Sequence, residues 1–428
     1  MRFIADFHIH SKFSRATAKD LDLENLHVAA QKKGITVIGT GDFTHPAWFS
    51  DIKQKLVAAE EGLFKLRDGL RHRCDRQVSR SCRSTVRFIF VTEISNIYKK
   101  NGKTRKIHNL IFLPDMESVE NFNKSLEKIG NIQSDGRPIL GLDAKNLLEI
   151  VLETSPDGYL IPAHIWTPWF SILGSKSGFD ALEECFEDLT PHIFAVETGL
   201  SSDPAMNWRI SGLDGLTLIS NSDAHSPAKL GREANLLNTE LSYAAIKSAI
   251  NTGDPERFLG TFEFYPEEGK YHLDGHRKCN VRLRPQGTIE NGGICPVCAK
   301  PLTLGVLYRV EALADRPAGV KPAKFHPFYN IIPLDEVLSE VLMVGPGSKK
   351  VREKLTELIE KFGSEFKILH VLEPRQLENS GVPLLAEAIR RMRRGKIELS
   401  PGYDGKFGKI KIFSPTERES LLGQKSLF

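Results

Sequence analysis

The sequence lacks any apolar run long enough to cross a bilayer, and it has few cysteines for its length. Six unevenly spread cysteines among 428 residues argue against a disulfide scaffold and predict a reducing, cytoplasmic setting. The first expected strand begins at residue 2 or 3, which leaves no room for a secretory leader. The net charge of +4 is also small and does not by itself predict a polyanionic partner. We therefore expect a cytoplasmic protein with no membrane partner.

What is present is the composition of a globular chain, with 40% hydrophobic and 26% charged residues, long enough for two or three domains. In the first half, short β-rich runs alternate with helical patterns, which predicts an α/β fold. The seven runs are residues 3–10, 36–41, 87–95, 106–113, 159–166, 193–199 and 216–222.

Each of the seven runs contains, or leads directly into, an Asp, Glu or His. These residues are His8, His10, Asp42, His45, Glu93, His108, His164, Glu197, Asp223 and His225. Burying so many unpaired carboxylates and imidazoles is costly unless cations neutralise them. In a barrel of mostly parallel strands, the carboxyl ends of the strands meet at one mouth. Imidazole and carboxylate ligands without cysteine suit catalytic zinc, manganese or iron, so the set predicts a multinuclear metal centre.

Two acids in these runs have other interpretations. Asp6 shares a strand face with His8 and His10, and we expect it to orient a ligand rather than bind a metal. Glu197 is either a further ligand or a buried acid paired with an arginine.

The order of these motifs resembles the PHP family of metal-dependent phosphoesterases over roughly the first 235 residues. The resemblance rests on "HIHS" from residue 8, the Asp42/His45 turn, Glu93, His108, "PAH" at 162–164 and "SDAH" at 222–225. It implies a distorted seven-stranded (β/α) barrel. One metal would be held by His8, His10, Glu93 and Asp223; a second by Glu93, His108 and His164; and a third by His225 with His45 or Asp42. Glu93, Asp223 and His225 would be the catalytic residues.

The sequence departs from the family pattern at two places, and both weaken the third metal position. Ser14, Arg15 and Ala16 stand where many members have an acid or a histidine, and two residues separate Asp42 from His45. We therefore expect two to three divalent ions, Zn²⁺, Mg²⁺ or Mn²⁺. Arg15 is either a phosphate clamp in place of the missing ligand or a surface residue.

A second metal signature lies further along the chain, at His276, Cys279, Cys295 and Cys298. Paired knuckles with this spacing predict a tetrahedral structural Zn²⁺ site. His272 is an alternative fourth ligand, but the spacing favours His276.

The C-terminal third contains two helical patterns, 333–343 and 351–363, joined by "VGPGSKK". This arrangement resembles a helix-hairpin-helix, and the DNA-binding residues it predicts are Gly345, Gly347, Ser348, Lys349 and Lys350. A basic helix end adds Arg390, Arg391, Arg393 and Arg394. A plain turn between helices and favourable charge at a helix terminus are the alternative interpretations. The arginine-rich segment 67–87 is either a solvated insertion or a basic arm for nucleic acid.

Over essentially the whole chain, the sequence closely resembles the endonuclease Q family. The resemblance implies a PHP metal-dependent phosphoesterase barrel (1–258), a zinc-binding module (259–318) and a helical, basic, DNA-binding C-terminal domain (319–428). It implies a hydrolase that cuts damaged single- or double-stranded DNA 5′ of uracil, hypoxanthine, xanthine or an abasic site, leaving a 3′-hydroxyl and a 5′-phosphate. Trp166, Trp169, Phe170 and Tyr329 are candidate walls of a base pocket, with ordinary core packing as the alternative interpretation for each. Gln424, Leu427 and Phe428 resemble a sliding-clamp tail.

Two other functions fit parts of the sequence. A small-molecule phosphatase of the histidinol-phosphate kind would use the same barrel, but it has little need of a zinc module and a basic end. A non-catalytic DNA-binding protein would use those modules, but it has no need of the near-complete ligand set.

Overall fold

The computed structural model describes residues 1–425, without the side chains of Cys82 and residues 422–425. Leu427 and Phe428 of the expected clamp tail therefore lie outside the described residues, as does the side chain of Gln424. Within residues 1–425, none of the helices combines the length and the apolar character needed to span a membrane.

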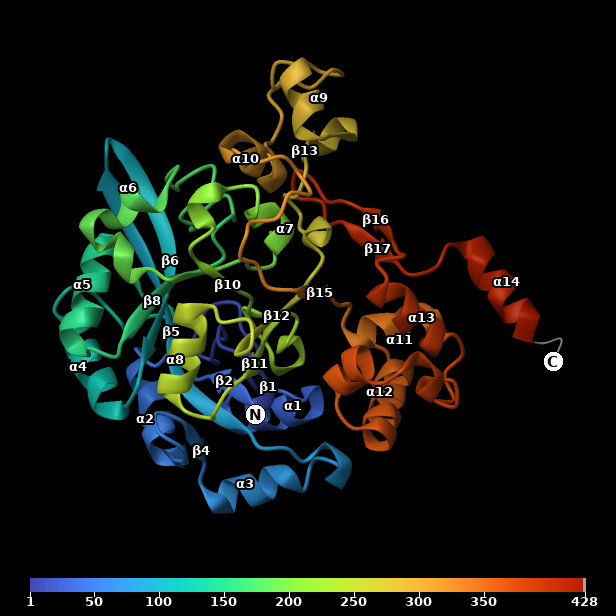
Figure 1. The fold of residues 1–428 in the computed structure, drawn as a ribbon, viewed down its shortest axis with the longest axis horizontal. Coiled ribbons are helices and arrows are strands. Elements are labelled where there is room, and N and C mark those ends of the chain that lie inside the picture. The colour runs from blue at the N-terminus through green and yellow to red at the C-terminus, as the bar shows by residue number, and fades with distance from the viewer. Residues whose placement is uncertain (426–428) are drawn as a thin grey trace.

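A mixed sheet of eleven strands forms the centre of the molecule (Figure 1). Its main path runs β15-β12-β11-β1-β2-β5-β4-β3, with β6 and β7 paired to β5 and β8 paired to β6. The strands are β1 (Arg2–Asp6), β2 (Val37–Gly39), β3 (Leu56–Ala58), β4 (Phe64–Leu66), β5 (Arg87–Lys100), β6 (Lys103–Leu113), β7 (Ile139–Leu140), β8 (Tyr159–Pro162), β11 (Ala234–Asn238), β12 (Phe258–Glu263) and β15 (Phe328–Asn330). The expected α/β fold is confirmed.

The sheet does not close into a barrel within the part of the chain that the structure describes. β1, β2 and β5 are parallel, but β5, β6 and β8 are antiparallel, because β5 and β6 form one long hairpin. β9 (Ala195–Glu197) and β10 (Thr217–Ile219) form a separate parallel pair. That pair is linked to the β8 side by a hydrogen bond from the Ile165 amide to the Glu197 carbonyl (3.0 Å). A closed seven-stranded barrel of mostly parallel strands is therefore not what the strand pairing gives.

Helices cover the sheet, and most of them carry a buried apolar face. In the first half they are α1 (Leu23–Lys33), α2 (Pro46–Lys55), α3 (Asp68–Asp75), α4 (Met116–Glu127), α5 (Ala144–Thr154), α6 (Leu182–Phe186), α7 (Pro204–Asn207) and α8 (Tyr243–Thr252). α1 shows why such segments are helical: the Asp22 carboxylate accepts the Asn25 amide at its start, and Gly34 ends it at a φ of 88°. Leu23, Leu26 and Ala30 on one face are fully buried.

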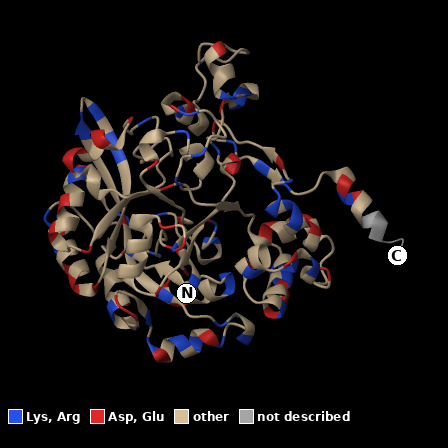
Figure 2. Ribbon diagram, in the orientation of Figure 1, with Lys and Arg blue, Asp and Glu red and all other residues tan. Residues whose placement is uncertain are grey.

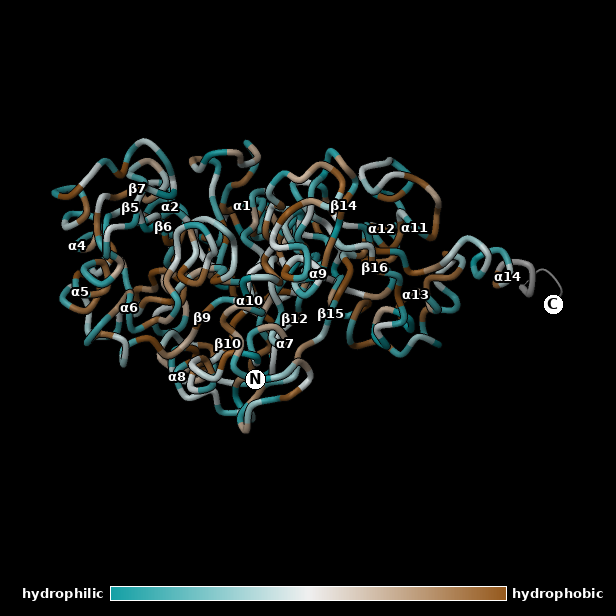
Figure 3. Tube along the Cα trace, turned by 90° about the horizontal axis from the view of Figure 1, so that it is seen from above, coloured by the Kyte–Doolittle hydropathy of each residue, from teal (hydrophilic) through white to brown (hydrophobic). Residues whose placement is uncertain are grey.

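The second half adds a projecting lobe and a helical region. The lobe contains β13 (Asp274–His276), β14 (Val281–Leu283), α9 (Pro285–Glu290) and α10 (Val306–Leu313). The helical region contains α11 (Leu334–Leu342), α12 (Lys349–Phe362), α13 (Leu385–Arg393), the hairpin of β16 (Glu398–Ser400) and β17 (Lys409–Lys411), and α14 (Pro415–Lys425). Figure 3 shows these helices beside the central sheet, with α14 extending from them.

The three expected segments are interleaved rather than separate. β12 continues the central sheet to Glu263, past residue 258, and β15 from the third segment pairs with β12. The segment before β17 returns to the lobe, where the Leu273 amide donates to the Gly402 carbonyl (3.0 Å). Lobe, sheet and helical region therefore share backbone contacts.

The arginine-rich segment 67–87 packs between the sheet's helices and the C-terminal region. α3 lies against α1, where Gln31 donates to Asp75 (2.9 Å), and the Ser81 hydroxyl donates to the Glu360 carbonyl of α12 (2.9 Å). The guanidinium-bearing residues Arg73, Arg76, Arg80 and Arg83 are exposed. Figure 2 shows lysine and arginine along this segment as well as on the C-terminal helices.

Candidate metal centre

Three ligand-type side chains from distant parts of the chain meet beyond the ends of β1 and β10. His8 and His10 follow β1, and Asp223 follows β10. A bridge between Ile9 and Ala224 and a hydrogen bond from the His10 amide to the Ala224 carbonyl (3.1 Å) hold the two loops side by side. One ligand atom from each of His8, His10 and Asp223 lies within 4.8 Å of the others.

A second group of ligand atoms with the same spacing contains Glu93 of β5, His108 of β6 and His164, which follows β8. Glu93 Oε1 lies 2.6 Å from His108 Nδ1 and 2.9 Å from His164 Nε2. The same carboxylate faces the first group, with Oε1 3.6 Å from His8 Nε2 and Oε2 3.5 Å from His10 Nε2. Glu93 therefore lies between the two groups, where a bridging carboxylate would lie.

His8 provides the test of whether these residues fit metal ions. Its Nε2 atom is buried and has no hydrogen-bond partner among the described residues. Glu93 Oε1 and Asp223 Oδ1 each lie 3.6 Å from this nitrogen. An unpaired ring nitrogen facing two carboxylates is costly in a protein interior, and a divalent cation bound among them would satisfy all three groups. The donor set fits divalent metals.

Electrostatics keep both carboxylates ionised at neutral pH. Burial would raise the pKa of Glu93, but His108, Arg137 and His8 hold that pKa well below its usual range. Burial also opposes ionisation of Asp223, and His8 and His10 outweigh it and lower the pKa of Asp223. Both side chains can therefore act as ligands without first losing a proton.

Two further buried acids, Glu197 and Asp42, belong to neither of the two groups of candidate metal ligands and instead orient the histidines. Glu197 Oε2 lies 3.0 Å from His8 Nδ1 and accepts the His164 amide (2.8 Å), while its Oε1 accepts the Asn221 side-chain amide (2.8 Å). Asp42 Oδ1 lies 3.1 Å from His10 Nδ1. A carboxylate at Nδ1 fixes the ring so that Nε2 faces the metal position. The sequence suggested that Glu197 is either a further metal ligand or an acid paired with an arginine, and its contact with the His8 ring is neither of these.

Asp6 supports the loop that carries Asp223. Its carboxylate accepts the Ser222 amide (3.0 Å), the Ser222 hydroxyl (2.6 Å) and the Gly231 amide (2.8 Å). Burial raises the pKa of Asp6 to about 6, against the lowering effect of those hydrogen bonds. Asp6 thus supports the loop next to Asp223 and joins none of the ligand groups, and the expectation that it orients a ligand stays a prediction.

The three residues expected at a third metal position are not brought together. Asp42 Oδ2 accepts the Ser11 amide and hydroxyl (both 2.6 Å) and the Ser14 hydroxyl (2.8 Å), so Asp42 is fully engaged behind His10. His45 is the N-cap residue of α2 and stacks on Phe13, with ring centroids 4.4 Å apart. The Nδ1 atom of His225 lies 2.8 Å from the backbone carbonyl of Asp223. Within the described residues, none of the three belongs to a group of side chains that could hold a metal ion.

The knuckle residues of the projecting lobe do come together. One ligand atom from each of His276, Cys279, Cys295 and Cys298 lies within 4.8 Å of the others, and Cys298 Sγ is 3.3 Å from His276 Nδ1. Burial opposes ionisation of Cys295, but amides of its own knuckle lower the pKa of its thiol to about 7. His272 stands outside the group and is buried, which lowers its pKa to about 4. This set fits a tetrahedral Zn²⁺ site.

A cleft of about 740 Å³ opens beside the histidine cluster and reaches the lobe. Aromatic, basic and acidic side chains line much of it, namely Trp169, Phe170, Phe264, Tyr271 and Phe407, with Arg137, Lys229, Arg232 and Lys270 beside Glu197, Asp223, Glu268 and Glu336. Trp169 and Phe407 are 43% and 70% exposed, so their rings are free to stack on a ligand. Of the four candidate pocket walls named from the sequence, Trp169 and Phe170 lie here, whereas Trp166, which is fully buried, and Tyr329 are not among the residues that line the cleft.

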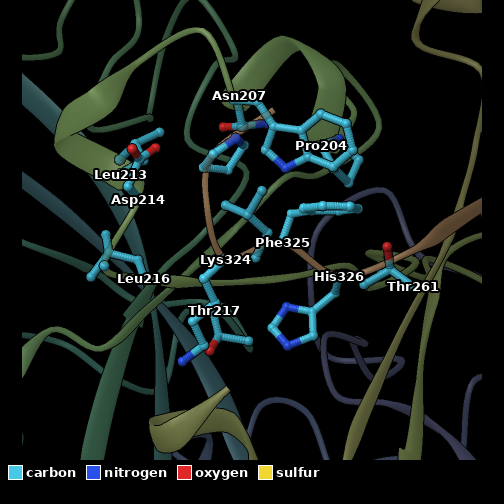
Figure 4. A pocket seen from close by; sticks show the side chains of 14 residues that line it. Pro204, Asn207, Leu213, Asp214, Leu216, Thr217, Thr261, Lys324, Phe325 and His326 are labelled. Carbon is cyan, nitrogen blue, oxygen red and sulfur yellow. The ribbon is translucent and has the colours of Figure 1, made fainter. Parts of the chain in front are cut away.

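A second cavity lies away from the cluster, between the loop that follows α7 and residues 322–326 (Figure 4). Its volume is about 30 Å³, which is room for about one water molecule. Trp208, Phe325 and His326 are among its lining residues, and none of the metal-type residues is. It is too small for a nucleotide.

The hairpin residues of the C-terminal region are open to solvent. Gly345, Gly347, Lys349 and Lys350 are exposed, and the Ser348 hydroxyl accepts the Val351 amide at the start of α12 (3.3 Å). The basic end of α13 is different. Arg391 is buried and bound to Glu387 (3.0 Å) and Glu417 (2.9 Å).

Two neighbouring arginines, Arg390 and Arg393, also use their guanidinium groups in contacts within the protein. Arg393 donates to the Leu369 carbonyl (2.7 Å), and Arg390 pairs with Glu387. Of the four arginines, Arg394 is the exposed one. The structure therefore places Arg391 in the packing of α13 against α14, not on a binding surface.

Sequence reasoning missed Arg137, whose Nη1 donates to Glu93 Oε2 at 2.9 Å. Its only signal is the turn sequence "SDGRP" at 134–138, which has no metal-ligand residue pattern. Arg15, the arginine considered from the sequence, has a side chain that is 74% exposed and is paired with Asp135 (3.1 Å).

Comparison with known proteins gives one partial family match and several relatives. Residues 333–396 match the family model described as the MJ0043 C-terminal domain. The uncharacterized protein MJ0043 of Methanocaldococcus jannaschii is 35% identical over 263 residues, which are 59% of this chain and 32% of that protein. The chain thus spans about a third of that relative's length. The uncharacterized protein YqxK of Bacillus subtilis is 29% identical over 96% of this chain and 99% of its own length.

Among the solved structures that match, two endonucleases cover nearly the whole chain. The lesion-specific endonuclease PfuEndoQ from Pyrococcus furiosus is 30% identical, with a TM-score of 0.83 and coverage of 96% of this chain and 95% of its own. An endonuclease Q bound to a 27-mer duplex with an abasic lesion at the active site is 29% identical, with a TM-score of 0.82 and coverage of 97% and 98%.

Proposed function

The chain belongs to the endonuclease Q family, and from that premise we propose that it is a metal-dependent DNA repair endonuclease. It hydrolyses the phosphodiester 5′ of a deaminated base (uracil, hypoxanthine or xanthine) or of an abasic site, and leaves a 3′-hydroxyl and a 5′-phosphate. Its substrate is damaged DNA, single- or double-stranded.

The observation that carries this proposal is the pair of ligand groups joined by Glu93, placed at the edge of a cleft that has aromatic rings and both basic and acidic side chains in its lining. In this proposal His8, His10 and Asp223 hold one divalent ion, and His108 and His164 hold a second, with Glu93 between them. Zn²⁺, Mg²⁺ or Mn²⁺ bound there would activate water and stabilise the leaving oxygen. The chain itself fixes the imidazole rings through Glu197 and Asp42 and positions Asp223 through Asp6. His225 stands beside Asp223 at the partly exposed edge, where it can contact substrate.

The remaining parts of the chain position the polymer. Arg232 and Lys270 in the cleft offer cations to backbone phosphates, whereas Lys229 is paired with Glu336 (3.3 Å). Exposed aromatic rings offer stacking surfaces to an extruded nucleotide. We assign catalysis to residues 1–258, viewed as an opened PHP-type barrel. Residues 259–318 form the zinc-stabilised module, and residues 319–428 bind DNA through Gly345, Gly347, Ser348, Lys349, Lys350 and Arg394. Recruitment by a sliding clamp through the C-terminal tail belongs to the same proposal.

The test is a 5′-labelled duplex with one deoxyuridine, incubated with each divalent ion beside an undamaged duplex. We expect a single nick directly 5′ of the uracil. His8→Ala removes a ligand and abolishes the nick, whereas His192→Ala, which changes an exposed histidine, leaves the nick intact.

Two results would overturn the proposal in different ways. Hydrolysis of a simple phosphate monoester without any cut in damaged DNA would mean a small-molecule phosphatase. Tight binding of damaged DNA that stays intact with every metal would mean a non-catalytic DNA-binding protein.

A further inference from the structure

A short turn, Asp135–Gly136–Arg137, is fixed against the base of the histidine cluster. The Asp135 carboxylate accepts the Arg137 amide (3.1 Å) and the Arg15 amide (3.4 Å), and the Gly136 amide donates to the Phe13 carbonyl (3.0 Å). The turn is therefore tied both to itself and to the loop that follows His10.

Gly136 shows how close this approach is. A Cβ atom at Gly136 would lie 2.3 Å from Asp42 Oδ2 and 2.5 Å from the Ser14 hydroxyl, so only glycine fits there. Asp42 and Ser14 are hydrogen-bonded to each other (2.8 Å), which leaves them no room to move aside. The backbone of the turn packs directly on the residues that orient His10.

Arg137 extends from this turn to the carboxylate between the two ligand groups. Its Nη1 donates to Glu93 Oε2 (2.9 Å), while its Nε and Nη2 atoms make no hydrogen bond to any described residue. The Arg137 side chain is 25% exposed, whereas Glu93 is inaccessible, and Arg137 lines the cleft beside His108, His164 and Asp223. A guanidinium that is anchored on one edge and open on the other is suited to a second, bidentate anionic partner.

We propose that Arg137 binds the scissile phosphate and supplies the third positive charge of the centre. This inference rests on the proposed function. When water adds to phosphorus and the bond to the 3′ oxygen breaks, negative charge grows on the non-bridging oxygens. The free edge of Arg137 donates hydrogen bonds to one of those oxygens, and Glu93 keeps the guanidinium in place. Of the residues expected from the sequence at a third metal position, Asp42 is hydrogen-bonded to Ser14 and His45 stacks on Phe13.

A binding experiment tests this contact without reference to turnover. Two lesion duplexes are compared, one natural and one with a neutral methylphosphonate at the scissile position, with Ca²⁺ as the added ion and the duplex checked to remain uncut. We expect the wild type to lose at least about tenfold in affinity on the neutral duplex and Arg137→Gln to lose less than about threefold, as in a double-mutant cycle. An equal loss in both proteins would overturn the proposal.

Turnover and metal content give independent readouts. Arg137→Gln lowers kcat by about 10²- to 10³-fold, and Arg137→Lys recovers part of the loss. Lys128→Gln, which removes an exposed cation at the end of α4, changes neither kcat nor binding. Metal analysis should give two ions in the centre and one in the cysteine site for the wild type and for Arg137→Gln. A third ion in the wild-type centre would overturn the proposal.

The two proposals fail separately. A wild type that never nicks damaged DNA would refute the proposed function. A wild type that nicks, with an Arg137→Gln variant that nicks equally well, would refute only the role of Arg137.

Discussion

Glu197 offers a direct way to test how the metal centre is held together. Replacing it with glutamine keeps the shape of the side chain but exchanges one acceptor oxygen for a donor. In the native protein both oxygens of Glu197 are engaged, with His8 Nδ1 at 3.0 and 3.1 Å, the His164 amide at 2.8 Å and the Asn221 amide at 2.8 Å. All of these partners can donate, so the amide group of a glutamine must face one of them without forming a bond.

The expected cost follows from that one lost hydrogen bond. A hydrogen bond to a buried charged group contributes about 1.5–3 kcal/mol. Each 1.4 kcal/mol corresponds to about tenfold in an equilibrium constant, so Glu197→Gln should weaken metal binding roughly 10- to 100-fold. His8 links Glu197 to the first ligand group and His164 links it to the second, so both ions should be released more readily.

Chelator competition measured with a metal-sensitive dye checks this expectation. Glu184→Gln is the matched control, because Glu184 is exposed and lies on α6, and it should retain metal like the wild type. His8→Ala is the positive control for metal loss. If Glu197→Gln held its metals as tightly as the wild type while His8→Ala lost them, the idea that Glu197 orients the histidines would be wrong.

Four other predictions concern stability, zinc binding and DNA binding. Burial raises the pKa of Glu263 to about 8 from its ordinary 4.5, so between these values the native state holds a proton that the unfolded state releases, and stability falls as pH rises. Glu263→Gln should remove about 3 kcal/mol of this cost at pH 7. In urea unfolding near pH 5 and near pH 8.5, the free energy of unfolding should fall more steeply with pH in the wild type than in Glu263→Gln. An equal fall in both proteins would contradict the prediction. Cys295→Ser should release one zinc ion and make the lobe sensitive to protease, whereas Val297→Ser in the same knuckle should do neither. Replacing both Lys349 and Lys350 by alanine should reduce the slope of log affinity against log salt by about 2, measured by fluorescence anisotropy. Arg391→Met should instead lower the free energy of unfolding by about 2–3 kcal/mol, and a change in its salt slope alone would show that Arg391 contacts DNA.

The expected strands were found where the apolar runs lie, and the reason is local. A run such as 87–95 carries enough branched and aromatic residues to form a strand in almost any context, and it became β5. The closed barrel was not found, because closure depends on which strand edges meet. The long β5–β6 hairpin and the separate β9–β10 pair are outcomes of packing between distant segments.

The same distinction applies to the two metal-type sites. The knuckle spacing from His276 to Cys298 is short, so the sequence alone predicted that these four residues would come together. The histidine cluster was predicted from residue type and order, although its members are spread over more than 200 positions. Their separate roles could not be predicted, because the sequence around a buried aspartate such as Asp42 does not distinguish a metal ligand from a residue that orients a histidine.

The sequence by itself determined the chemistry available to this protein: a set of imidazoles and carboxylates at strand ends, a thiol knuckle pair and basic residues near the C-terminus. The tertiary structure alone decided how that chemistry is arranged. It turned Asp42 and Glu197 toward histidine rings, buried Arg391 in an ion-pair network and brought Arg137 to Glu93. Residue type and spacing record which groups a chain carries and which are near neighbours. Contacts between residues tens or hundreds of positions apart are set by packing, and only the folded chain defines them.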